Sequence, residues 1–248
     1  MSRVTTALQV AFDVGRRPLA RKEMVVHIQK TAGTSLRRLM AQQYPGHRCV
    51  FVYSLDPEPL EVVKRRAMRA DAVYGHFTYG FHEVLGVEAR YHTILREPTA
   101  RVVSAYRHSL QRDDNPFHER LQAGMSLLEL IESEEDHLMN NHMTRVIAGH
   151  QPTDTVTDRW MLDQALRNID EHFDVVGITE RMDDSVALLG HELGWTDLPP
   201  VGRHNENPDA QQVDLDVATL AAIRRYNALD DELYAVMAER FAARVAAG

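Results

Sequence analysis

The chain has 248 residues, of which 44% are hydrophobic and 26% are charged, and it contains one cysteine. This size and composition exclude disorder throughout, and a single cysteine excludes a secreted scaffold held by internal disulfides. Residues 1–112 hold 18 basic against 9 acidic residues, whereas residues 113–248 hold 10 against 27. The basic first half suits an anionic ligand, although mutual neutralisation of the two halves explains the charge equally well.

The start of the chain carries no targeting signal that we can identify. Its apolar run, TALQVAFDV, is interrupted by Gln9 and Asp13, and no cleavage-site pattern follows. The sequence therefore predicts neither a signal peptide nor a membrane span. Together with the single cysteine, this favours a reducing compartment, so we expect a cytoplasmic protein that does not bind membranes.

Short apolar runs alternate with segments of helical periodicity along most of the chain. This alternation predicts an α/β fold in three layers, with a central parallel sheet flanked by helices. The expected strands are 24–28, 49–53, 72–74, 91–95 and 173–178, and the expected helices are 35–43, 59–69, 98–112, 158–172, 182–193, 215–228 and 231–246.

We expect residues 1–248 to form one domain, with an N-terminal extension at 1–22 and a helical C-terminal part at 196–248. The polar stretch 113–124 contains Asn-Pro and is predicted to be a loop or flap. Ligands of open parallel sheets bind at the carboxyl ends of the strands. The site is therefore expected directly after strands 24–28, 72–74 and 91–95.

The segment HIQKTAGTSL, residues 27–36, has the composition of an anion-binding loop. A strand leads to Lys30, Ala32 and Gly33 permit close approach of the backbone, and Thr34 and Ser35 begin a helix whose free amides favour an anion. The early lysine distinguishes this loop from the usual G-x-x-x-x-G-K-[ST] pattern. The alternative is that a hydroxyl merely caps the helix and that Lys30 is solvated.

A second segment, ILREPTARVVSAYRH at residues 94–108, places Arg96 at the end of a strand and Ser104 two helical turns further on. A guanidinium and a hydroxyl suit a phosphate monoester. Arg101 and Arg107 are interpreted as ordinary surface arginines. Four other residues are weaker candidates for an acceptor pocket, namely Tyr79, His82, His108 and Arg145.

HIQKTAGTSL and LREPTARVVSAYRH resemble the two donor-binding motifs of the sulfotransferases that use 3'-phosphoadenosine 5'-phosphosulfate (PAPS). The similar branch includes the heparan sulfate 2-O- and chondroitin-type carbohydrate sulfotransferases. YGHFTYG, NHMTRVIAG and VGITERMDDSVALL extend the resemblance over most of residues 24–195. The chain departs from the usual pattern at Gln29, Ala32 and Glu97, where Pro, Gly and Asp are common. HNENP at 204–208 resembles a late cofactor loop only weakly.

The resemblance implies a P-loop-like fold and transfer of a sulfuryl group from PAPS to a hydroxyl, on a sugar or small metabolite. It implies that Lys30 stabilises the leaving phosphate and that His76 is the general base. The cofactor-binding residues that it implies are Lys30, Thr31, Ala32, Gly33, Thr34 and Ser35 for the 5'-phosphosulfate, with Arg96 and Ser104 for the 3'-phosphate.

Three alternatives remain at this point. A kinase-like phosphotransferase would need an acidic residue at a strand end, for which the sequence offers only Glu180. A non-catalytic nucleotide-binding module would not need both Lys30 and His76, and His76 alone would suit a local structural hydrogen bond. The histidines lack the spacing of a metal site, so no metal is expected. We expect a small-molecule or carbohydrate acceptor and no nucleic acid, and the sequence leaves the oligomeric state open.

Overall fold

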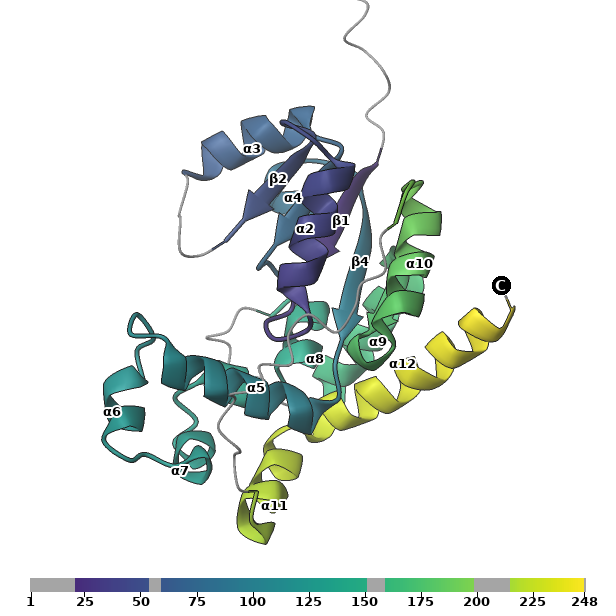
Figure 1. Ribbon diagram of the computed structural model, residues 1–248. Helices are drawn as coiled ribbons and strands as arrows, with labels where there is room; N and C mark the ends of the chain where they lie inside the picture. The colour runs from purple at the N-terminus through teal and green to yellow at the C-terminus, as the bar shows by residue number, and fades with distance from the viewer. Residues whose placement is uncertain (1–20, 54–58, 151–158, 199–214, 248) are drawn as a thin grey trace, which may run out of the picture.

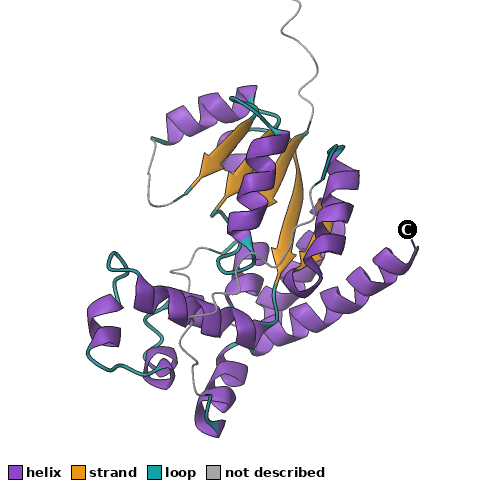
Figure 2. Ribbon diagram, viewed as in Figure 1, coloured by secondary structure: helices purple, strands orange, loops and turns teal. Residues whose placement is uncertain are grey.

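The computed structural model describes residues 21–53, 59–150, 159–198 and 215–247. In this part of the chain a single sheet has five strands, all parallel, in the order β2-β3-β1-β4-β5 (Figure 2). The expected α/β fold with a central parallel sheet is therefore confirmed. The strands are β1 (Lys22–Val26), β2 (Cys49–Val52), β3 (Ala72–Gly75), β4 (Ala89–Leu95) and β5 (Phe173–Ile178).

The first strand begins two residues earlier than expected, at Lys22, and ends at Val26. A lysine is tolerated at this buried position because its Nζ donates to the carbonyl oxygens of Ala70 at 2.5 Å and Met68 at 3.2 Å. His27 then leaves the sheet. This early exit gives the loop that follows enough length to turn across the carboxyl edge.

Helices cover both faces of the sheet, which accounts for the buried strands. On one face, Leu36 of α2 (Gly33–Gln43) and Leu189 of α10 (Met182–Leu193) pack on Val25 and Ile94. Figure 1 shows α2 and α10 in front of the strands. The opposite face carries α3 (Leu60–Arg69), α8 (His142–Ala148), α9 (Arg159–His172) and α12 (Ala228–Ala247), with α4 (Phe81–Leu85) beside α3.

A further group of helices lies beyond the carboxyl ends of the strands, below the sheet in Figure 1. It has an apolar cluster of its own, which includes Val102, Leu130 and Ile223. The predicted flap contributes to this cluster because it contains a short helix whose Leu121 is buried. Its action as a flap stays a prediction. The group consists of α5 (Pro98–Gln111), α6 (His118–Gln122), α7 (Leu127–Glu132), the 3-10 turn His137–Met139 and α11 (Val217–Tyr226).

A buried polar network fixes these helices to the rest of the domain. Arg101 of α5 is fully buried, so its interpretation as a surface residue is wrong. Its guanidinium lies 4.0 Å from the Asp230 carboxylate and donates to the Leu138 carbonyl at 2.7 Å. Asp230 also accepts from the amide and hydroxyl of Thr144, both at 2.7 Å. The network therefore joins α5, α8 and α12 in the buried interior.

Several expected features lie outside the described residues. These are residues 1–20 of the expected extension, the HNENP segment at 204–208 and the first residue of the helix expected at 158–172. Within the described part, the C-terminal region is helical as expected, with α11 and α12 separated only by Asn227. The division into one domain with these parts stays a prediction.

Candidate active site

Lys30, His76 and Arg96 come together at the carboxyl edge of the sheet. They follow β1, β3 and β4, which are adjacent, and Val26 is paired with both Gly75 and Thr93. The Arg96 guanidinium donates to the backbone carbonyl of Lys30 at 3.1 Å. The sequence therefore placed these three side chains at the correct edge, and their roles stay predictions.

The loop between β1 and α2 is shaped by two residues with left-handed backbone conformation. Lys30 has φ +73° and Ala32 has φ +62°, where glycine is normally favoured. Buried Thr31 between them donates its hydroxyl to the Ile28 carbonyl at 2.8 Å. The Thr31 amide donates to the same carbonyl at 3.4 Å, so Thr31 supports the loop from inside.

Helix α2 begins directly after this loop, at Gly33. The amides of Gly33 and Thr34 have no acceptor within the helix, whereas the Ser35 amide donates to the Ala32 carbonyl at 3.1 Å, and this turn contains no acidic residue. Thr34 is exposed and Ser35 is partly buried, so both are accessible from the carboxyl edge. The loop and the helix start together form a cradle for an anion.

Gly33 is required at its position for a reason that the sequence did not reveal. A Cβ atom at this residue would lie 1.6 Å from Nε2 of His27. The absent side chain therefore admits the His27 ring against the start of α2. Gly75 is similarly constrained, since its φ is +156° and a Cβ there would lie 1.9 Å from the Val52 carbonyl oxygen.

The positive side chains Lys30 and Arg96 lie at this edge without a carboxylate in ion-pair contact among the described residues. Burial lowers the pKa of Lys30 to about 8, with a smaller contribution from Arg96. Burial also lowers the pKa of Arg96, and Glu180 and Glu97 oppose that shift. A bound anion would therefore stabilise the charged forms of both.

Helix α5 adds two polar side chains to this edge. Its start is capped by Glu97, whose carboxylate accepts from the amides of Thr99 and Ala100. Ser104 is partly buried, and Arg107 follows one helical turn later on the same side. The charge of Arg107 is near enough to contribute to the lowered pKa of Arg96.

Nε of Arg107 is buried and has no hydrogen-bond partner in the described part of the chain. A buried donor without a partner is costly in a folded protein, and a bound anion would satisfy it. The interpretation of Arg107 as an ordinary surface residue therefore missed a candidate ligand contact. Its spacing of three residues from Ser104 was the available signal.

His76 follows β3 and is partly buried. Burial lowers its pKa to about 4, so its ring is neutral at pH 7. Its Nε2 lies 3.0 Å from Nδ1 of His27, a residue that the sequence did not single out. The edge of the Tyr53 ring packs against it, with 4.9 Å between ring centroids. A neutral imidazole in this position can accept a proton.

The weaker acceptor-pocket candidates fall in different places. His108 lies near Lys30, whose charge contributes to its lowered pKa. Tyr79 and His82 instead pack on Tyr91, near the start of β4 and away from the carboxyl edge. Arg145 is buried on α8. Of these four residues, His108 is therefore the one that senses the charge of Lys30.

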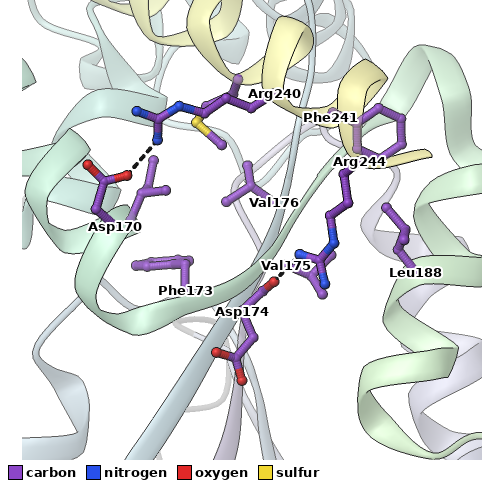
Figure 3. A pocket seen from close by; sticks show the side chains of 11 residues that line it. Asp170, Phe173, Asp174, Val175, Val176, Leu188, Arg240, Phe241 and Arg244 are labelled. Carbon is purple, nitrogen blue, oxygen red and sulfur yellow. Dashed lines mark hydrogen bonds and ion pairs between the residues drawn. The ribbon is translucent and has the colours of Figure 1, made fainter. Parts of the chain in front are cut away.

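A separate pocket lies near the start of β5, between α9 and α12, and has a volume of about 250 Å³ (Figure 3). Its arginines already have partners: Arg240 pairs with Asp170 at 2.5 Å, and Arg244 donates to the backbone carbonyl of Asp174 and pairs with Glu192. This pocket thus lacks the unmatched positive charge found at the carboxyl edge.

The family model of the galactose-3-O-sulfotransferases matches residues 61–248, more than half of the chain. The chain therefore belongs to this family and is a carbohydrate sulfotransferase with the corresponding P-loop-like fold. The match includes His76, Arg96 and Ser104 and begins after the Lys30 loop. Comparison with curated proteins gives no significant match.

Membership of this family contradicts the expected cytoplasmic location. The galactose-3-O-sulfotransferases are Golgi-resident type II membrane enzymes, so a cytoplasmic assignment has no support. The expectation was wrong because it took a missing signal and a low cysteine content as evidence of location. No helix in the described residues combines the length and the apolar character needed to cross a bilayer.

Ala32 provides a test of the loop geometry. Because alanine at φ +62° is strained, Ala32→Gly is expected to raise the free energy of unfolding by about 1 kcal/mol. Ala41→Gly is the matched control on the exposed side of α2 and is expected to lower it by about 1 kcal/mol. Urea unfolding measures both, and equal destabilisation by the two variants would contradict the left-handed conformation.

Proposed function

We propose that the chain transfers the sulfuryl group of PAPS to a hydroxyl of a galactose-containing sugar, with Lys30 at the leaving phosphate and His76 as the general base. The observation that carries this proposal is that an anion cradle and a neutral histidine share one sheet edge. Family membership supports the reaction class and the sugar acceptor. The choice of galactose as the acceptor sugar follows the activity for which the galactose-3-O-sulfotransferase family is named.

The cradle fits the 5'-phosphosulfate end of the donor. The backbone amides of Ala32, Gly33 and Thr34 and the hydroxyl of Ser35 would bind its oxygens, while Thr31 would hold the loop in shape. Negative charge grows on the oxygen that leaves toward the 5'-phosphate, so a cation placed there stabilises the transition state more than the ground state. Lys30, with a pKa of about 8, is mostly protonated at pH 7 and would supply that charge.

Arg96 and Ser104 would bind the 3'-phosphate, which PAPS has and ATP lacks. The unpaired Nε of Arg107 adds a donor that the same phosphate could satisfy. Two guanidinium groups close enough to lower a pKa are unfavourable together unless an anion lies between them. This part of the site is therefore proposed to select PAPS over nucleotides without a 3'-phosphate.

At the acceptor end, His76 would accept the proton of the attacking hydroxyl. The acceptor oxygen bonds to sulfur, the bond between sulfur and the 5'-phosphate oxygen breaks, and the proton moves to the imidazole. Glu180, which a kinase-like reaction would need as a metal ligand, accepts from the Glu97 amide at 3.1 Å and the Tyr234 hydroxyl at 2.9 Å. These bonds give Glu180 a structural role, and the absence of a metal requirement stays a prediction.

Donor selection is tested by thermal shift. We expect 3'-phosphoadenosine 5'-phosphate to stabilise the chain and ADP or ATP-Mg²⁺ to have little effect. Arg107→Ala should weaken binding of the 3'-phosphorylated nucleotide by about 10- to 100-fold, since a charged hydrogen bond is lost. Arg112→Ala, at an arginine directly after the same helix that already pairs with Asp114, is the control. Preference for ATP-Mg²⁺ would overturn the proposed donor.

The assignment of His76 is tested by sulfate transfer from labelled PAPS to galactose-terminated oligosaccharides. His76→Ala should reduce kcat by about 100-fold or more, because general-base catalysis contributes 10²–10⁴-fold, while nucleotide affinity is retained. His82→Ala, which alters a histidine away from the cradle, should keep its turnover. Undiminished turnover by His76→Ala would refute the role.

The charge on Lys30 is tested by the pH dependence of kcat/KM for PAPS. Lys30 must be protonated, so the rate is expected to fall as pH rises through about 8. In Lys30→Arg this fall should disappear, because a guanidinium stays charged to well above pH 10. Lys64→Arg, at a partly buried lysine of α3 that pairs with Glu61, should retain the fall. Retention of the fall in Lys30→Arg would contradict the assignment.

A further inference from the structure

We propose that His27 is a positioning residue for His76: it accepts a hydrogen bond from Nε2–H of His76 and so leaves Nδ1 of His76 as the nitrogen that takes the acceptor's proton. This inference rests on the proposed role of His76 as general base. It assigns a function to His27, which comes three residues before Lys30 and had none from the sequence.

The two rings are in direct contact. Nε2 of His76 lies 3.0 Å from Nδ1 of His27, and the ring centroids are 4.6 Å apart. The other ring nitrogen of His76, Nδ1, has no hydrogen-bond partner among the described residues. Nδ1 is therefore the atom available to an acceptor hydroxyl.

The direction of the hydrogen bond decides whether His76 can act as a base. If His27 donated, neutral His76 would carry its own proton on Nδ1, and neither of its nitrogens would have a free lone pair. If His76 donates, Nδ1 keeps its lone pair. Once Nδ1 accepts the substrate proton, the imidazolium still donates from Nε2 to His27, and that hydrogen bond becomes stronger because its donor is charged.

The surroundings of His27 hold its ring in the orientation that this role requires. It stacks on Tyr74, with 5.6 Å between centroids and an angle of 11°. Tyr74 is fully buried, and its hydroxyl donates to the Gly33 carbonyl at 2.8 Å. Nε2 of His27 faces the space where Gly33 has no side chain. The acceptor nitrogen is thus fixed from both sides of the ring.

His27 is also neutral, as an acceptor must be. Its pKa is lowered to about 3, mainly by burial and further by His76 and Lys30. Among the described residues, the other groups that face this pair are Tyr53 and Tyr74, Arg37 above the Tyr53 ring, and His142, whose pKa is lowered by burial and further by His76. None of these groups is a carboxylate that could stabilise a protonated His76. Protonated His76 therefore depends on its hydrogen bond to the neutral ring of His27.

Two substitutions separate the hydrogen bond from the packing of the ring. His27→Phe keeps an aromatic ring on Tyr74 and removes the acceptor, whereas His27→Asn replaces Nδ1 by an amide oxygen at the same distance from the backbone. We expect His27→Phe to lower kcat by about 10- to 100-fold with little change in KM for PAPS. His27→Asn should recover most of the lost kcat. His82→Phe is the matched control and should keep both constants.

The tautomer of His76 gives a readout that a merely structural role would not change. In enzyme labelled with ¹⁵N-histidine, NMR of the wild type is expected to show His76 protonated on Nε2. A wild-type spectrum with the proton on Nδ1 would overturn the proposal, and it does so even if His27→Phe fails to fold. Equal kcat for folded His27→Phe and wild type would also overturn it.

The outcome for His76→Ala separates the two hypotheses. If His76→Ala is inactive and His27→Phe is fully active, only the role of His27 fails. If His76→Ala turns over at the wild-type rate, the proposed general base fails, and the positioning role fails with it. A loss in both variants, with recovery in His27→Asn and the Nε2-protonated tautomer in the wild type, supports the pair.

Discussion

The ring of His27 fills the space that a side chain at position 33 would occupy, and this close approach joins the two parts of the site. On one side of the ring, α2 begins and presents its amides to an anion. On the other side, His76 lies within hydrogen-bonding distance. A larger residue at position 33 would move either the histidine or the helix, and the anion cradle would no longer lie beside the proposed base.

The site also brings together positively charged side chains. Lys30, Arg96 and Arg107 lie near one another at a partly buried edge, where burial lowers the pKa of Lys30 and of Arg96. Other arginines of the fold do pair with carboxylates, as in the contacts of Arg240 with Asp170 and Arg90 with Glu23. Part of the basic character of the first half of the chain therefore lies where an anionic donor is proposed to bind, and part of it pairs with the acidic half, as in the contacts of Arg90 with Asp174 and Arg101 with Asp230.

Most of the fold could be predicted from the sequence because its strands and long helices have clear patterns. Strand 173–178 and helix 182–193 match the structure, and the other expected elements differ by a few residues at their ends. Helix α8 was missed because all seven of its residues are buried, which removes the polar side of the helical pattern. Arg101 was misjudged because its partner Asp230 is distant in sequence.

The site was predictable only in part. The position of Lys30, His76 and Arg96 follows from the strand ends, but the left-handed conformations of Lys30 and Ala32 and the contact of His27 with His76 depend on how the loop folds back. The central claim is most directly tested by transfer of labelled sulfate from PAPS to a galactose-terminated acceptor, comparing the wild type with Lys30→Met. The account predicts transfer by the wild type and a loss of about 100-fold or more in a folded variant. Equal transfer by both would contradict it.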